Sequence, residues 1–110
     1  MSEGSWREPT FLILTALAAG AQHGYGIMTD VSQISGGRVR LRAGTLYAAL
    51  NRLAVEGVVE VDREEIADGR LRRYYRLTPH GGQRLSAEVE RMRQNTAVAA
   101  RRLAQLDGPA

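Results

Sequence analysis

The chain has 110 residues, 44% of them hydrophobic, which suffices for one compact core and is too little for two. Its formal net charge is +3, all 15 basic residues are arginine, and no cysteine is present, which excludes disulfides, cysteine-ligated zinc and thiol redox chemistry. No basic signal-peptide region opens the chain, and the apolar run at 11–19 has about half the ~20 residues of a membrane span, so we expect a cytoplasmic protein.

The first predicted helix runs from Pro9 to Gly20. Proline is tolerated in a first helical turn and glycine is a common stop signal. Its nearly continuous apolar character indicates burial on most sides. Trp6, the only tryptophan, lies just upstream. Two interpretations of Trp6 stay open, a local cap on the core and a cover for a neighbouring chain.

A second short helix is expected after the glycine turn that begins at His23. Four apolar residues are spaced to pack inward as the first arm of a helix-turn-helix, namely Ile27, Met28, Val31 and Ile34. A single histidine beside a glycine turn is usually a hydrogen-bonded structural residue, so we assign His23 no chemistry.

Three arginines precede the third predicted helix, where Arg38, Arg40 and Arg42 alternate with Val39 and Leu41. This is the period of a short extended segment with one apolar and one basic side. Positive charge at a helix N-terminus opposes the helix dipole, so a nearby DNA phosphate would compensate for it. A solvated charged edge is the alternative, and a GC-rich genome would also enrich arginine.

The third helix is predicted from about Ala43 to Glu56, with Gly57 as its stop. Its core stripe is Leu46, Leu50 and Leu53, and its exposed side carries Thr45, Tyr47, Ala48, Asn51 and Arg52. Two strands should follow, turning at Asp68-Gly69. On the second strand Tyr75 and Leu77 share the packed face, and Arg72, Tyr74 and Arg76 share the other.

The last helix is predicted to run from Pro79 to Leu106 behind a Thr78 cap, about 40 Å at ~1.5 Å per residue. Its apolar seam has the spacing of a coiled coil and consists of Leu85, Val89, Met92, Thr96, Ala99, Leu103 and Leu106. The helix is longer than so small a core can cover, which favours a two-fold homodimer. The alternative is a seam that folds back on its own domain.

These elements predict a mainly α fold with a small β-wing: a winged helix-turn-helix domain at 1–78, then a long C-terminal dimerisation helix at 79–110. The chain resembles the PadR family of bacterial transcriptional regulators through motifs along nearly its whole length. They are His-Gly-Tyr-Gly-Ile at 23–27, Gly-Thr-Leu-Tyr-Ala-Ala-Leu at 44–50, Arg52-Leu53, Glu56-Gly57 and Tyr-Tyr-Arg-Leu-Thr at 74–78. The single C-terminal helix is similar to the family's short subgroup.

The resemblance implies a dimeric repressor of a pseudo-palindromic operator, in which Tyr47, Thr45 and Arg52 lie on DNA. From the exposed helix face we expect Arg52 to pair with guanine, Asn51 with adenine and Tyr47 with a phosphate. The full predicted DNA-binding set is Arg38, Arg40, Arg42, Gly44, Thr45, Tyr47, Asn51, Arg52, Arg70, Arg72 and Arg73. The predicted dimer interface is Trp6, Phe11, Leu85, Val89, Met92, Ala99 and Leu103.

Two residues depart from the family pattern: Ala48 replaces its usual proline, and Arg42 replaces its usual serine or threonine cap. Both leave the half-site preference open. The resemblance also implies a small aromatic or cationic effector near the dimer interface, where Trp6, Phe11 and Met92 could line a pocket; plain interface packing is the alternative.

An enzyme is not expected, because no nucleophile or carboxylate pair has a suitably spaced base. We expect no cofactor and no metal. The remaining rival is a winged-helix module that binds protein rather than specific DNA, since a fold does not dictate its partner.

Overall fold

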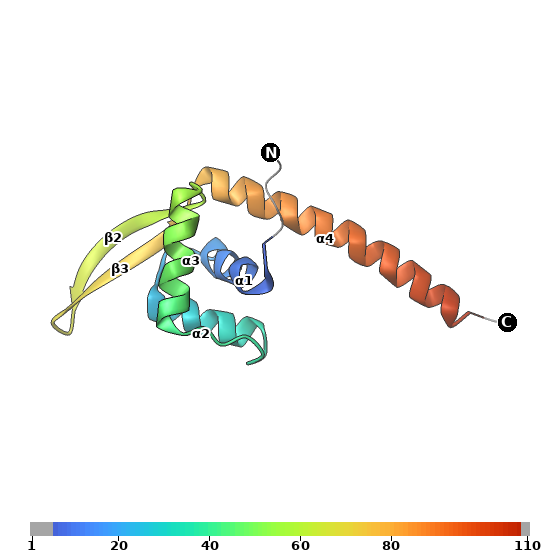
Figure 1. Cartoon of the computed structure of the whole chain (residues 1–110), viewed down its shortest axis with the longest axis horizontal. Helices are drawn as coiled ribbons and strands as arrows, with labels where there is room; N and C mark the ends of the chain where they lie inside the picture. Colours follow the sequence, from blue (N-terminus) through green and yellow to red (C-terminus); the bar gives the residue numbers. More distant parts are fainter. Residues whose placement is uncertain (1–5, 109–110) are drawn as a thin grey trace.

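A computed structural model of the chain describes residues 6–108. Its elements in order are α1 (Glu8–Ala18), β1 (Gln22–His23), α2 (Gly24–Ile34), α3 (Ala43–Val55), β2 (Val59–Ala67), β3 (Arg70–Leu77) and α4 (Pro79–Leu106). The molecule measures 67 × 33 × 21 Å, because the β2–β3 hairpin and α4 extend from opposite sides of a three-helix body (Figure 1). We call residues 6–78 the head and the β2–β3 hairpin the wing. The mainly α architecture with a small wing confirms the predicted fold class.

The core lies where α1, α2 and α3 meet. Leu14, Ile27, Leu46 and Leu50 are completely buried there, as the apolar spacing of the three helices predicts. Ile34 was expected to pack inward but is 45% exposed, because it is the last residue of α2 and lies past the contact with the core. The chain then turns at Gly36 and Gly37, which both have positive φ.

Local capping fixes where the helices begin. The His23 Nδ1 accepts a hydrogen bond of 3.2 Å from the Gly26 amide at the start of α2, which confirms its structural role. At α4, the Thr78 hydroxyl accepts from the Gly81 amide at 2.9 Å and donates to the Gly57 carbonyl at 2.6 Å. The predicted cap therefore also ties α4 to the end of α3.

The sheet is antiparallel with strand order β1-β3-β2. Sequence periodicity missed β1, since two residues are too few to show alternation. The wing turns at Asp68 and Gly69, both with positive φ, as predicted. A β-bulge lies between Val61 and Arg63 and makes two residues of β2 oppose one of β3.

α4 has two different halves. Gly81, Leu85 and Glu88 are buried against the head, whereas every residue from 90 to 108 is exposed. Leu85, predicted for the dimer interface, instead packs into the core of its own head, so little of it is left for a partner. No helix within residues 6–108 is long and apolar enough to cross a membrane.

Candidate nucleic-acid interface

α3 turns a ridge of small side chains to solvent. With Leu46, Leu50 and Leu53 buried, the opposite side of the helix carries Gly44, Ala48, Asn51 and Val55. Val55 is 89% exposed, and the space above Gly44 is open. A helix with such a ridge can approach a flat or grooved ligand closely with its backbone.

Tyr47 borders the ridge on the side of the wing. Its hydroxyl lies over the backbone of Gly24, so closely that a methyl group there would overlap it. Its ring lies 6.5 Å from the ring of Tyr75 on β3, tilted by 54°. These two neighbours hold the side chain in place, yet 42% of Tyr47 is exposed. Tyr47 therefore offers a positioned phenol beside the ridge.

Thr45 and Arg52 border the ridge on the side of α1. The Arg52 guanidinium donates a 3.4 Å hydrogen bond to the hydroxyl of Thr10, a buried residue in the first turn of α1. Arg52 thus bends toward α1, away from the outermost line of α3. Sequence reasoning did not include Thr10 in the site, because no local pattern shows that α1 begins beside α3.

The arginines before α3 have three different surroundings. Arg38 forms a bidentate ion pair with Glu8 of α1, at 2.6 and 2.5 Å, and this hydrogen bonding lowers the pKa of Glu8. Arg40 donates to the Gly37 carbonyl at 3.1 Å. Arg42 is the N-cap of α3 and makes no side-chain capping bond, in agreement with its departure from a serine or threonine cap.

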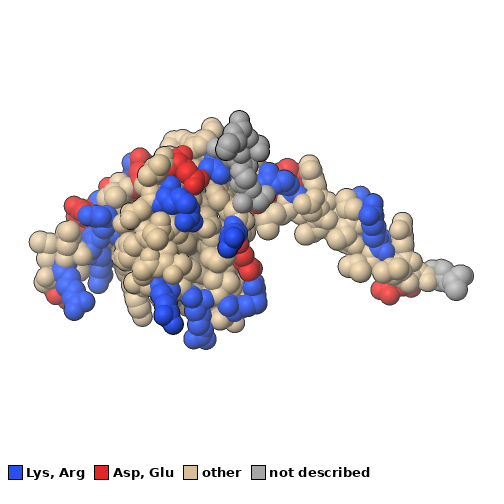
Figure 2. All heavy atoms as spheres, in the orientation of Figure 1, with Lys and Arg blue, Asp and Glu red and all other residues tan. Residues whose placement is uncertain are grey.

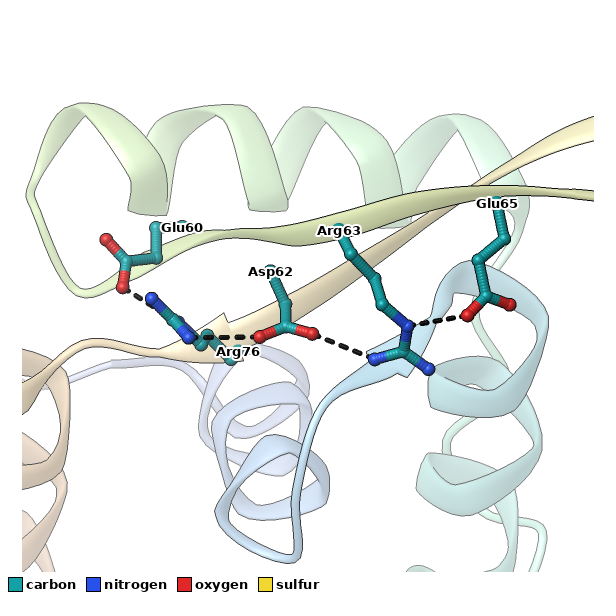
Figure 3. Close-up of polar contacts among 5 residues, drawn as sticks. All are labelled: Glu60, Asp62, Arg63, Glu65 and Arg76. Atoms are coloured by element: carbon teal, nitrogen blue, oxygen red, sulfur yellow. Dashed lines mark hydrogen bonds and ion pairs between the residues drawn. The ribbon is translucent and has the colours of Figure 1, made fainter.

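Most charged side chains of the wing form ion pairs. On the face turned away from α3, Arg76 bridges Glu60 and Asp62, and Arg63 bridges Asp62 and Glu65, as Figure 3 shows. Hydrogen bonding by Arg63 lowers the pKa of Glu65. We call these five residues the ladder.

The three predicted wing arginines divide between the two faces. Arg73 pairs with Glu64 at 2.8 Å on the face of Tyr75. Arg70 and Arg72 make no ion pair within residues 6–108. Of the predicted set on the wing, these two cations are therefore the ones without an ion pair, although Arg72 lies opposite Glu65 and its charge helps to lower the pKa of that carboxyl.

Charge is unevenly spread over the head. Residues 31–55 include four arginines and no acidic residue. Figure 2 shows blue spheres without red ones along the lower edge of the head, where α2 and the start of α3 lie in Figure 1. On the face drawn in Figure 2, this edge therefore carries positive groups with neutral atoms between them, next to the exposed ridge of α3.

Trp6 lies beside α1 and the first half of α4. Arg84 stacks over its ring at 4.5 Å, and its buried Nε1 has no hydrogen-bond partner among the described residues. A cavity of about 340 Å³ beside it is lined by Trp6, Glu8, Phe11, Leu12, Glu88 and Met92. Glu88 is buried and pairs with Arg91.

Residues 6–108 contain no group of three or more acidic or histidine side chains that could hold a metal.

The structure brings most predicted site residues onto one side of the head. Thr45, Tyr47 and Asn51 surround or form the ridge, while Arg40 and Arg42 lie at its N-terminal end. Arg38 is drawn back to α1 by Glu8, and the wing residues lie across Tyr75 from α3.

Comparison with known proteins identifies the family. The model of the "Transcriptional regulator PadR-like family" matches residues 13–87. The chain is 38% identical to "Transcriptional regulator Rv3488" of Mycobacterium tuberculosis over 69 residues, 63% of this chain and 61% of that protein. It is 32% identical to "Uncharacterized protein X" of Lysinibacillus sphaericus over 79 residues, 72% of each chain.

Solved structures agree in fold. A PadR family transcription regulator from Clostridium difficile R20291 aligns with a TM-score of 0.71 and 25% identity, over 88% of this chain and 99% of that one. Bacillus subtilis PadR, solved in complex with operator DNA, aligns with a TM-score of 0.67 and 26% identity, over 76% of this chain and 47% of that one. The family is one of transcription regulators, not of enzymes. The chain belongs to the PadR-like family of transcriptional regulators.

Proposed function

We propose that the chain is a dimeric DNA-binding repressor that recognises a pseudo-palindromic operator through α3 and is released by a small-molecule effector. The observation that carries the proposal is the exposed, small-residue ridge of α3 inside a segment with four arginines and no acid. A similar head in Bacillus subtilis PadR was solved with operator DNA, which supports the same use here.

On DNA, the ridge of α3 enters the major groove. Asn51 lies on the ridge and contacts an adenine edge, and Gly44 with Ala48 lets the helix backbone come close. Tyr47 contacts a phosphate on the side of the wing, and Arg40 and Arg42 contact phosphates at the N-terminal end of α3. On the wing, Arg70 and Arg72 add electrostatic affinity.

The second half of α4 forms the dimer. Met92, Ala99 and Leu103 lie along its exposed seam, and the 60% exposure of Leu103 is explained by a partner helix that covers it. Residues 1–78 then form the DNA-binding domain, and the dimerisation helix at 79–110 holds two such domains ~34 Å apart, one turn of DNA. The regulator acts in the cytoplasm, where the DNA is.

The effector occupies the cavity beside Trp6. Aromatic walls from Trp6 and Phe11 suit an aromatic cation, because a ring face attracts positive charge even though Glu8 and Glu88 are already paired with Arg38 and Arg91. Tetraphenylphosphonium should quench Trp6 fluorescence and weaken operator binding. An unchanged operator affinity at saturating quench would contradict release by this route.

The deciding experiment is a mobility shift with the DNA upstream of the chain's own gene and an unrelated duplex of equal length, at two salt concentrations. We expect preferential, salt-sensitive binding with dimer stoichiometry. The alternative outcome is equal, feeble binding to both duplexes. If a random-sequence selection then enriches no site, the remaining function is that of a protein-interaction module.

A further inference from the structure

A groove lies between the first turn of α1 and the side of α3, next to the exposed ridge. Its volume is about 450 Å³. Its lining residues are Arg7, Pro9, Thr10, Ile13, Leu41, Gly44, Thr45, Ala48, Ala49 and Arg52. Gly44 and Ala48 belong both to this groove and to the ridge. Whatever covers the ridge therefore continues into the groove.

The groove has an apolar floor and a cationic rim. Pro9, Ile13 and Leu41 contribute apolar surface, whereas Arg7 and Arg52 are exposed at the rim. The 3.4 Å hydrogen bond to the buried Thr10 hydroxyl directs the Arg52 guanidinium toward the rim of the groove, where its remaining N–H groups can meet an anion.

The one acidic residue of the first turn of α1 does not oppose an anion here. Both carboxylate oxygens of Glu8 are engaged by the guanidinium of Arg38. Its charge is therefore balanced locally, and the groove keeps the two positive charges of Arg7 and Arg52. The ion pair also links the start of α1 to the segment that leads into α3.

We propose that the groove is a seat for one sugar-phosphate unit of the DNA strand that borders the major groove, with Arg7 and Arg52 on the phosphate. The inference rests on the proposed function. An α-helix of ~10–12 Å diameter fills a major groove ~12 Å wide, so the two phosphate backbones run along the sides of α3. On the α1 side the backbone meets this groove, and its deoxyribose covers the apolar floor.

The seat changes two assignments. Arg7, which no sequence pattern singles out, becomes a DNA-binding residue. Arg52 contacts the backbone instead of the guanine expected from its helical position, because its guanidinium is held against α1. Phosphate contacts position a protein on DNA without reading sequence, so both arginines act on affinity for every duplex.

The test compares Arg7→Ala and Arg52→Ala with Arg76→Ala, which removes the same charge from the ladder on the face turned away from α3. Full-length dimers are titrated with operator and with an unrelated duplex over a range of salt. Loss of one phosphate contact per protomer should lower the affinity for both duplexes about tenfold and reduce the salt slope by ~1.8 per dimer. Arg76→Ala should leave the slope nearly unchanged.

Ethylation interference supplies the second readout. Ethylation of one phosphate per half-site should block the wild type and no longer affect Arg7→Ala. If the wild type binds DNA normally and Arg7→Ala binds it with the same affinity and salt slope, the proposed function stands and the seat is overturned. Selective loss of operator binding in Arg52→Ala would also overturn it, since that result marks a base contact. Absence of wild-type binding to any duplex would overturn the proposed function together with the seat.

Discussion

The segment 31–55 and the wing both stand out in the sequence by their arginines, yet their electrostatics differ. The segment has four arginines and no acidic residue, whereas residues 59–77 have five of each sign and are neutral. In the segment one arginine of four is held by a carboxylate, and in the wing Arg63, Arg73 and Arg76 all are.

The difference shows that the number of arginines on one strand does not determine the electrostatic potential around that strand. In an antiparallel hairpin each side chain faces a residue of the other strand, and β2 supplies acids opposite β3. Positive potential able to attract DNA therefore gathers around the start of α3, and the wing contributes structure and a few cations at its tip.

The strongest test of this contrast removes cations from each region. Arg40→Ala with Arg42→Ala should weaken operator binding about a hundredfold near 0.1 M salt, because a dimer loses several phosphate contacts. Arg63→Ala with Arg76→Ala, equal in charge, should weaken it about twofold or less. Fluorescence anisotropy with a labelled operator measures both. Equal losses in the two double variants would refute the contrast.

Close approach of α3 is tested by Gly44→Ala. A methyl group at this position meets open space in the free protein, and alanine favours helix, so the free energy of unfolding should rise, by less than the ~1 kcal/mol of a helix interior because Gly44 lies in the first turn. Operator affinity should nevertheless fall about tenfold, because the methyl group separates the helix from the DNA bases. Gly82→Ala in α4, also with open space, is the control that should gain stability without losing affinity. Undiminished operator binding by Gly44→Ala would argue against a close-packed ridge.

A gain of binding should follow from freeing a wing arginine. Glu64→Gln releases Arg73 from its 2.8 Å ion pair and adds one net positive charge. Affinity for operator and unrelated duplex should both rise two- to threefold, with a steeper salt dependence. Glu90→Gln, on the exposed part of α4, makes the same charge change away from the wing. A rise of the same size in both variants would show that only net charge matters.

The smallest expected effect concerns His23, which caps the start of α2 and has an edge contact of 5.3 Å with Tyr74 on the wing. Burial, and then the charge of Arg72, lower the pKa of His23. The unfolded chain therefore binds this proton more readily, so stability is full above the ordinary value of about 6.5 and is lost as pH falls below it. The melting temperature should drop less between pH 7.5 and 5.5 in His23→Asn, which retains a capping side chain. An identical drop in the wild type and in His23→Asn would show that protonation of His23 does not cause the loss of stability.

Local rules predicted the helices well. The bounds of α4 agree with the sequence expectation, since Thr78 with Pro79 is a strong start signal and the apolar seam carries the helix to Leu106. The leucine stripe located α3, and the Asp68-Gly69 turn located the wing. These features depend on residues a few positions apart.

Features that depend on distant residues were not predictable. Glu8 and Arg38 are 30 positions apart, so nothing local indicates that α1 would engage this predicted DNA contact. The bulge after Val61 brings Asp62 and Arg63 into the same ladder, against simple alternation. Leu85 fits a coiled-coil seam equally well, and only packing of α4 on the head assigns it to the core.

The joint between α4 and the head gives the molecule a mechanical property. A methyl group at Gly81 would overlap the Val58 carbonyl oxygen, so α4 crosses the start of the wing at backbone contact. From this contact, residues 81–106 of α4 form a helical arm of ~39 Å. A tilt of about 5° at the joint displaces the far end by ~3 Å, so a small change near Gly81 is amplified at the end of the helix.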